Sequence, residues 1–278
     1  MARSNITPLI LLGLPLAFFA AFFLAPMCVV AVSSLSDPKG TFTIANYMRI
    51  LLDQYHWDIL AVTFKLALAT TLICDVLGYP LAYYLVRGVP SRTWRRLCVI
   101  LLVLPLFTSN IVRSFGWIVL LGRRGLVNDW LMGSGLTHSP VRLLGTETGI
   151  LIGLVYIHLP FVVLAVGNAL GRLDRSLEDA AADLGAGRAT TFWTVTFPLC
   201  LPGFIAGTIT VFALSVGAYV TPALLGGGRI TMFSMLIFQQ YSSVFDFNYG
   251  GALSATLLIL TLIMVSAANW LGSTRRTT

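Results

Sequence analysis

The sequence predicts an all-α integral membrane protein with six transmembrane helices. Of its 278 residues, 57% are hydrophobic and only 10% are charged, whereas soluble domains carry roughly 25% charged residues. So little charge cannot cover a water-facing surface. Six apolar stretches are each long enough to cross a bilayer, which takes about 20 helical residues. They lack the alternating pattern of a membrane barrel, and lipid offers no partner for free backbone polar groups, so the stretches are read as helices.

The six spans are placed near residues 8–33, 59–86, 97–121, 148–170, 201–224 and 251–271. The first apolar stretch is longer than the roughly 7–15 residues of a signal-peptide core, so it is read as an uncleaved span. A turn at Asp37-Pro38-Lys39-Gly40 follows it. Apolar residues then recur at helical spacing, which predicts a short amphipathic surface helix; they are Ile44, Tyr47, Met48, Leu51 and Leu52.

Basic residues set the expected orientation. With six spans both termini lie on one side, and that side carries the larger share of arginines: Arg3, Arg87, Arg92, Arg95, Arg96, Arg172, Arg175, Arg188, Arg275 and Arg276. The positive-inside rule then places both termini in the cytoplasm. The net charge of +7 is explained by this topology. No aromatic and basic pattern indicates a nucleic-acid partner.

The sequence contains no metal-binding motif and no nucleotide-binding motif. Cys28, Cys74, Cys98 and Cys200 are widely spaced and have no metal-ligand spacing. The glycines at 226–228 are not followed by the Lys-Ser/Thr of a phosphate-binding loop. The chain is therefore expected to bind no metal and to hydrolyse no ATP by that route.

The segment 174–200 is a long polar loop between two spans. Ser176 and Asp179 have the spacing of a capping box that opens a helix. Small and apolar residues share one face of this helix, acids flank it, and glycines end it; these residues are Leu177, Glu178, Asp179, Ala180, Ala181, Asp183, Leu184, Gly185 and Gly187. A second short helix is expected over 190–197, ending at Pro198. A helix that rests on a membrane surface prefers Lys and Arg on its polar face, so these acids favour a protein partner over a plain surface connector.

The loop resembles the EAA loop of ABC-importer permeases. Asp179-Ala180-Ala181 is followed after three residues by Gly185, and Phe197-Pro198 and Leu201-Pro202-Gly203 lie downstream. Asp179 stands where that family usually has Glu. A second stretch, Leu104 to Ser109 with Val112 to Trp117, is similar to the third span of the spermidine/putrescine branch, which also includes carriers of opines and aminophosphonates.

The resemblance implies a type I ABC-importer permease fold in the bacterial inner membrane, without catalytic activity of its own. It implies no cofactor in this chain itself, because ATP and Mg are bound by a separate ATPase subunit, which is expected in two copies.

 

The resemblance further implies that the ATPase docks on Glu178, Asp179, Ala180, Ala181, Asp183, Leu184 and Gly185. It also implies a second related permease and an external solute-binding protein, with lipid around the spans.

Polar residues inside the spans are candidates for the translocation path, because charges at membrane depth are costly and normally face protein or water. Asp75 either pairs with a cation inside the complex or lines a path for a cationic solute. For Arg113 a structural role is favoured over solute contact, and for Tyr219 packing is favoured over lining the outer half of the path. Lys65 is expected to snorkel to the surface, and His158 to satisfy a carbonyl at the Pro160 kink.

Three other classes compete with a permease subunit. A self-sufficient secondary transporter needs an intramembrane ion-coupling site, usually built from repeated broken helices, and the chain shows no clear internal repeat. An intramembrane enzyme needs a catalytic constellation at depth, which one deep histidine and scattered cysteines do not supply. A structural anchor does not explain polar residues in several spans.

Overall fold

A computed structural model describes residues 6–37 and 39–274. Arg3, Arg275 and Arg276, which contribute to the expected orientation, and Pro38 of the predicted turn lie outside the described residues. By its internal contacts the chain divides into two compact parts. The first part comprises Met1–Asp58 and Met235–Leu260, and the second comprises Ile59–Ser234 and Thr261–Thr278.

Helices make up nearly all the regular structure of the described residues. Their only extended pairing is an isolated bridge between Ser36 and Phe42. Within that described range, five helices are long and apolar enough to cross a membrane, and a sixth is counted if one bent pair is taken as a single span. The predicted all-α membrane class is thereby confirmed.

The first part begins with one apolar helix built from three segments, α1 (Ile6–Phe19), η1 (Ala20–Leu24) and α2 (Ala25–Ser34). Its large side chains are exposed, as at Leu14 (78%) and Phe22 (71%), so lipid or a partner must cover them. The predicted amphipathic helix is present as α3 (Ala45–Leu52). The remaining elements of this part include α13 (Phe233–Gln239), η5 (Gln240–Val244) and the start of α14 (Phe247–Thr274).

Side-chain contacts fix the polar end of the first part. The Ser34 hydroxyl lies 2.7 Å from the Tyr47 hydroxyl. The Tyr249 hydroxyl lies 2.5 Å from Nε2 of His56, and the Arg49 guanidinium stands 4.5 Å above the Tyr249 ring. These contacts join α2 to α3, and α3 and the start of α4 to α14.

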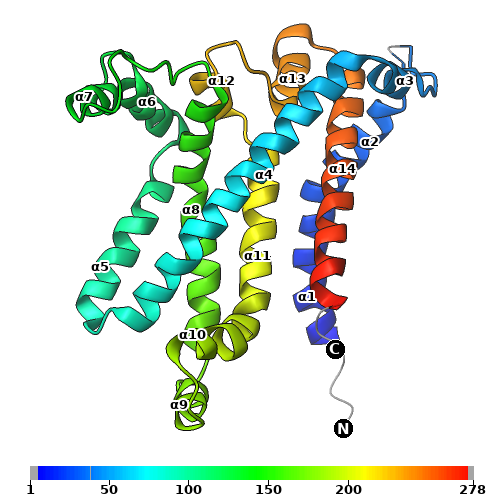
Figure 1. The fold of residues 1–278 in the computed structure, drawn as a ribbon. Coiled ribbons are helices and arrows are strands. Elements are labelled where there is room, and N and C mark those ends of the chain that lie inside the picture. Colours follow the sequence, from blue (N-terminus) through cyan, green and yellow to red (C-terminus); the bar gives the residue numbers. More distant parts are fainter. Residues whose placement is uncertain (1–5, 38, 275–278) are drawn as a thin grey trace. The chain divides into compact units, whose positions relative to one another are not determined.

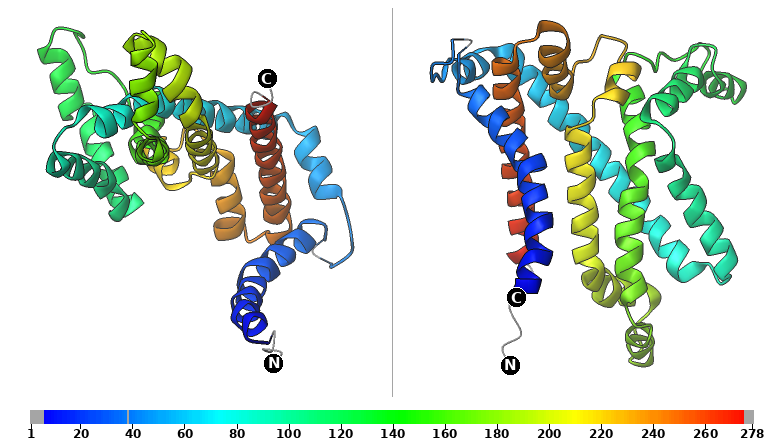
Figure 2. Two further views of the ribbon diagram at one scale, coloured as in Figure 1. Left: turned by 90° about the horizontal axis from the view of Figure 1, so that it is seen from below. Right: turned by 180° about the vertical axis from the view of Figure 1, so that it is seen from behind.

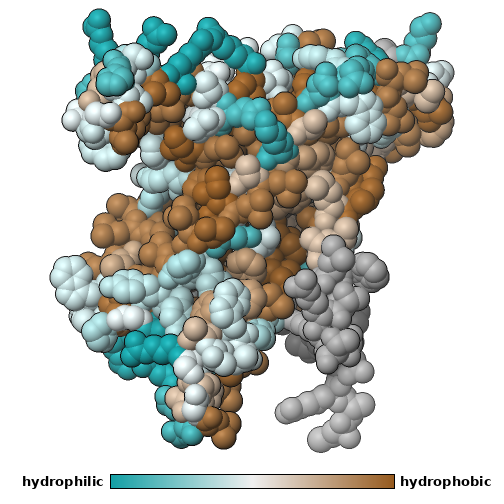
Figure 3. Space-filling model, in the orientation of Figure 1, coloured by the Kyte–Doolittle hydropathy of each residue, from teal (hydrophilic) through white to brown (hydrophobic). Residues whose placement is uncertain are grey.

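The second part contains the helices that carry the candidate site. In chain order they are α4 (Gln54–Tyr83), η2 (Tyr84–Gly88), α5 (Arg92–Val103), η3 (Leu104–Phe107), α6 (Asn110–Leu121), α7 (Leu126–Gly133), α8 (Glu147–Arg172), α9 (Ser176–Asp183), α10 (Arg188–Thr191), η4 (Phe192–Thr196), α11 (Phe197–Val216) and α12 (Val220–Leu225). Helix α9 projects beyond the ends of α8 and α11, and α6, α7 and α12 lie at the opposite end (Figures 1 and 2). Hydrophobic residues cover the middle of this part (Figure 3).

The long helices α8 and α11 pack closely because small residues face each other. A β-carbon at Gly203 would come within 2.4 Å of the β-carbon of Ala169, and one at Gly207 would come within 3.1 Å of that of Ala165. Close backbone approach of this kind is what small residues permit in membrane helices. A buried apolar cluster continues from this contact onto α4 and includes Cys74, Leu85, Val162, Val166, Leu170, Cys200 and Val211.

The third predicted span, 97–121, is not one straight helix. The helical stretches Arg92–Phe107 and Asn110–Gly133 meet at an angle of 102°. Pro105 lies in the tight turn η3, and the Ser109 side chain caps α6 by accepting a hydrogen bond from the Ile111 amide at 3.3 Å. The proline and the new cap explain why helix α5 ends before α6 begins.

The fifth predicted span, 201–224, also has different bounds. One continuous helical stretch runs from Arg188 to Val216, so the separate short helix expected over 190–197 was a wrong prediction. Pro198 fits near the start of α11 because the preceding π turn η4 absorbs the irregularity: the Phe197 amide bonds to the carbonyl of Phe192, five residues earlier. The helix ends at Val216, and α12 begins after a short break.

Candidate functional site

The first turn of α9 is capped by Asp174. The Asp174 carboxylate accepts a hydrogen bond from the Ser176 amide at 3.0 Å, and this bond lowers the pKa of the exposed Asp174 carboxyl below its ordinary value. The Asp179 amide bonds to the Arg175 carbonyl at 3.0 Å and not to the Ser176 hydroxyl, so the predicted capping box of Ser176 and Asp179 was wrong. Asp174 takes the role because an aspartate readily bonds the backbone two residues ahead.

Helix α9 ends at a glycine, as the sequence predicts. Gly185 has a φ of +86°, a left-handed conformation that glycine adopts without steric cost. The Gly185 amide bonds to the Ala182 carbonyl at 2.9 Å, and the Ala186 amide bonds to the Ala181 carbonyl at 3.0 Å. This pair of bonds is a Schellman motif, which satisfies the last carbonyls of the helix.

The tip of α9 is open to solvent. The side chains of Asp179, Ala180, Asp183 and Leu184 are exposed, and Leu184 reaches 89% exposure. Neither acid forms an ion pair with any described residue. The tip therefore combines two carboxylates that form no ion pair with a described residue and an exposed leucine, on a helix whose last carbonyls are hydrogen-bonded. We call these four residues the α9 tip.

Glu178 and Ala181 differ from the α9 tip because both are only partly exposed. The Glu178 side chain is 21% exposed and turns back toward the long helices. Its Oε1 atom accepts a hydrogen bond from the Thr196 hydroxyl at 3.0 Å and lies 3.3 Å from Nε of Arg87. The sequence places Glu178 in the loop with the other acids, and the structure gives it partners within the chain.

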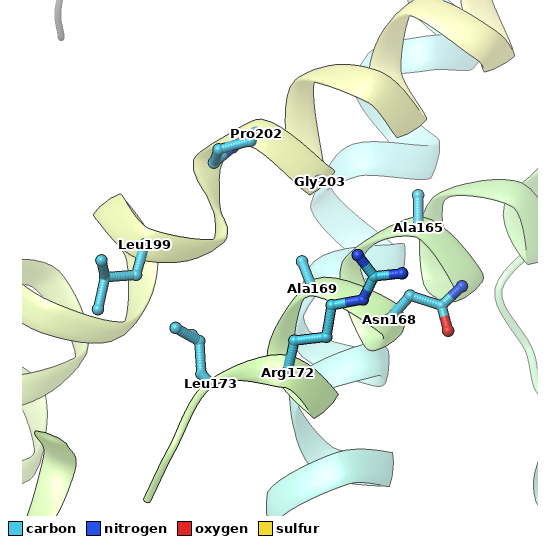
Figure 4. A pocket seen from close by; sticks show the side chains of 8 residues that line it. All are labelled: Ala165, Asn168, Ala169, Arg172, Leu173, Leu199, Pro202 and Gly203. Atoms are coloured by element: carbon cyan, nitrogen blue, oxygen red, sulfur yellow. The ribbon is translucent and has the colours of Figure 1, made fainter. Parts of the chain in front are cut away.

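A hollow of about 430 Å³ lies between the ends of α8 and α11 that the loop connects. Figure 4 shows its lining, with Asn168 and Arg172 on α8. The other lining residues are small or apolar: Ala165, Ala169, Leu173, Leu199, Pro202 and Gly203. The loop thus joins two helices that are tightly packed at Gly203 and leave a mainly apolar hollow beside that contact.

Tyr219 lines one cavity toward the other end of the second part, and Arg113 contacts another residue of its lining. The cavity measures about 330 Å³, and Asn110, His158 and Tyr219 are among its lining residues. The Arg113 guanidinium donates to the Asn110 side-chain oxygen. Nδ1 of His158 lies 2.9 Å from the Ser215 hydroxyl on α11, so the histidine contacts a side chain instead of the expected carbonyl. A cavity of this size suits a small ligand, since such sites measure about 300–1,000 Å³.

Asp75 lies on α4 and does not line that cavity. Its side chain is buried (8% exposed), and both carboxylate oxygens lie near the Thr208 hydroxyl, at 3.1 and 3.0 Å. Thr208 in turn lines a smaller, apolar cavity of about 160 Å³. No ion pair to Asp75 is found among the described residues. The predicted path residues Asp75, Arg113 and Tyr219 therefore do not share one cavity.

Lys65 is explained by a surface contact. Its ammonium lies 2.6 Å from a carboxylate oxygen of Glu147 at the start of α8, and its side chain is 64% exposed. No group of three or more metal-binding side chains occurs within the described part of the chain.

Comparison with known proteins decides the family. The family model of the binding-protein-dependent transport system inner membrane component matches residues 76–271. The chain belongs to this family. The predicted resemblance to importer permeases is thereby confirmed, and the protein is a multi-pass protein of the inner membrane.

Relatives within the permease family are similar over most of their length. The chain is 35% identical to the Escherichia coli spermidine/putrescine transport system permease PotB over 87% of this chain and 89% of the relative. It is 34% identical to PotB of Haemophilus influenzae, over 88% and 86%. The molybdenum transport system permease ModB of Mycobacterium bovis is 30% identical, over 74% and 76%.

Solved permeases share the fold at low sequence identity. A bacterial ABC transporter in complex with an alginate pentasaccharide-bound periplasmic protein matches with a TM-score of 0.81 at 16% identity, over 99% of this chain and 96% of that one. The MetNI methionine ABC transporter matches with a TM-score of 0.53 at 20% identity, over 81% and 99%. These likenesses confirm the permease fold for the chain.

Sequence reasoning missed the partners of the site residues. Arg87 was counted only toward orientation, and Thr196 and Thr208 were not singled out, although each contacts a carboxylate of the candidate set. Asp174 was passed over in favour of Ser176. The sequence signal for Asp174 was available, because an Asp two residues before a helical serine is typical of an Asx turn.

Proposed function

We propose that this permease is one membrane subunit of an ATP-driven importer for a small cationic solute of the polyamine type. An external binding protein delivers the solute, and a separate ATPase in two copies binds ATP and Mg. A second, related permease completes the path. Both termini face the cytoplasm, which is the side of the α9 tip.

The α9 tip carries the ATPase-docking part of this proposal. Asp179, Asp183 and Leu184 are exposed, unpaired with described charges and held on a short helix that is bonded at both ends. A rigid, protruding helix fits a surface groove of a partner, where an apolar anchor supplies contact area and flanking charges supply orientation. Motion of the ATPase then reaches α8 and α11 directly, because the loop connects them.

Asp75 supports a cationic solute. A buried carboxylate in a membrane helix is costly and needs a compensating charge, and the described residues supply only the Thr208 hydroxyl. A passing ammonium group would provide that charge. The relatives at 34–35% identity are named as spermidine/putrescine permeases, which agrees with this solute chemistry.

Reconstitution tests the proposal. The permease, its related permease and their ATPase are placed in vesicles, and uptake of labelled spermidine and putrescine is measured with and without ATP and the binding protein. We expect uptake only with all components present. Uptake by this chain without the ATPase would favour a self-sufficient secondary transporter and contradict the proposal.

A charge-neutral variant tests the solute class. Asp75→Asn keeps an oxygen for Thr208 but removes the negative charge, so polyamine uptake should fall by about tenfold, the effect of about 1.4 kcal/mol on a transport step. Asp129→Asn on α7 is the matched control, because Asp129 is an exposed acid, and it should leave uptake unchanged. If the importer takes up molybdate and no polyamine, and Asp75→Asn has no effect on uptake, the assignment of a cationic solute is wrong.

A further inference from the structure

Three helical elements meet at the Glu178 carboxylate on α9. The Thr196 hydroxyl, from the π turn that opens α11, donates to Oε1 at 3.0 Å. Nε of Arg87, from the turn that ends α4, lies 3.3 Å from the same oxygen. This second contact is an ion pair without hydrogen-bond alignment, since the Arg87 Nε–H has no hydrogen-bond acceptor. Both partners of Glu178 therefore come from membrane helices.

Arg87 also holds the end of α8. Its terminal Nη2 donates to the Leu173 carbonyl at 3.2 Å, and Leu173 is the C-cap residue that follows Arg172 at the end of α8. A cationic side chain is favourable at a helix C-terminus, where carbonyls lack partners. One guanidinium thus links the end of α4, the end of α8 and the start of α9.

Partial burial makes this linkage stronger than a surface ion pair. The Arg87 and Glu178 side chains are only 10% and 21% exposed, and Thr196 is 1% exposed. Leu85, next to this linkage, and Cys200, one helical turn after Thr196, belong to the buried apolar cluster of α4, α8 and α11. Water screens such a pair less than an exposed one, and removing either partner leaves an uncompensated charge.

We propose that Glu178 is a positioning residue that, with Arg87 and Thr196, fixes α9 to the ends of α4, α8 and α11. Displacement of the α9 tip then moves these helices together. Glu178 accordingly acts within the permease and does not dock the ATPase, whereas Asp179 and Asp183 remain at the tip. This inference rests on the proposed function, because it assumes that an ATPase moves α9.

Charge exchange tests the linkage. Arg87→Glu and Glu178→Arg each place like charges together, and the double exchange restores an opposite pair. In the reconstituted complex we expect each single variant to keep the ATPase bound while polyamine uptake per ATP hydrolysed falls by about tenfold, within the usual range of coupling between sites. The double variant should recover most of that loss. Arg175→Glu is the matched control, because Arg175 is exposed and forms no ion pair with a described residue; it should behave like the unaltered protein.

Two milder variants keep the test decisive if a charge reversal prevents folding. Glu178→Gln and Thr196→Val remove one contact each without creating repulsion, and both should lower uptake per ATP with the ATPase still bound. Full coupling in both would overturn the proposal, as would a double exchange that gives no recovery. Loss of ATPase binding in Glu178→Arg but not in Arg87→Glu would instead make Glu178 a docking residue. Failure of the unaltered permease to bind any ATPase would refute the proposed function itself.

Discussion

Replacing Gly185 should weaken the turn that ends α9. The residue has a φ of +86°, and a β-carbon there would meet no atom within 4 Å. The effect of Gly185→Ala is therefore conformational and not steric. Forcing an L-residue into the left-handed region costs about 1–2 kcal/mol, and a β-branched valine is worse.

Gly187 provides the matched control. A β-carbon at Gly187 also meets nothing within 4 Å, but its φ is −67°, which any residue adopts. Alanine at Gly187 should therefore leave the turn intact. The cost at Gly185 lowers the ratio of molecules with the native turn to those without it by roughly 5- to 30-fold. Molecules without the turn lack the two hydrogen bonds that end α9.

Coupled transport is the measurement. In vesicles that contain the full importer, Gly185→Val should lower uptake per ATP hydrolysed, Gly185→Ala should lower it less, and Gly187→Ala should not. Hydrogen exchange at the Gly185 and Ala186 amides should rise in the same order. Equal coupling in Gly185→Val and Gly187→Val would refute the idea that the left-handed turn shapes the docking helix.

Two further changes test other parts of the loop and its helices. Gly203→Ala should destabilise the α8–α11 pair by about 1–3 kcal/mol, as overpacking does, and should lower the thermal unfolding midpoint in detergent. Gly171→Ala should leave the midpoint unchanged, because a β-carbon at Gly171 meets no atom within 4 Å. Equal midpoints for the two variants would contradict the close packing. Asp174→Ala should speed hydrogen exchange in the first turn of α9, and Ser176→Ala should do so less, because it keeps the backbone amide that bonds to Asp174. The pKa of Asp174 is lowered in the folded protein, so its cap is present at neutral pH and is lost as the pH falls through that pKa. Hydrogen exchange in the unaltered protein should therefore rise only in acid. Exchange that responds neither to acid nor to Asp174→Ala would exclude the cap.

The membrane class and the identity of the loop were predictable because they depend on local sequence. Apolar length alone identifies the spans, and the pattern from Asp179 to Gly185 identifies the family. The end of α9 at Gly185 was predictable for the same reason, since only a glycine adopts that conformation easily.

Features that depend on contacts across the chain were not predictable. The pairing of Arg87 with Glu178 joins residues far apart in sequence, and no local pattern distinguishes Glu178 from Asp179. The break between α5 and α6 and the continuity of α10 with α11 both depend on how prolines are accommodated. Pro105 coincides with a 102° bend, whereas Pro198 follows a π turn that lets the helix continue.

The π turn η4 makes the chain sensitive to length at one point. A π turn holds one residue more than an α turn, and each residue rotates an α-helix by about 100°. Deleting a single residue from Phe192–Thr196 would convert the stretch to regular α-helix and rotate everything before it relative to α11. Thr196 and the α9 loop would then face different directions, so a one-residue deletion here should be more harmful than most substitutions in the same turn.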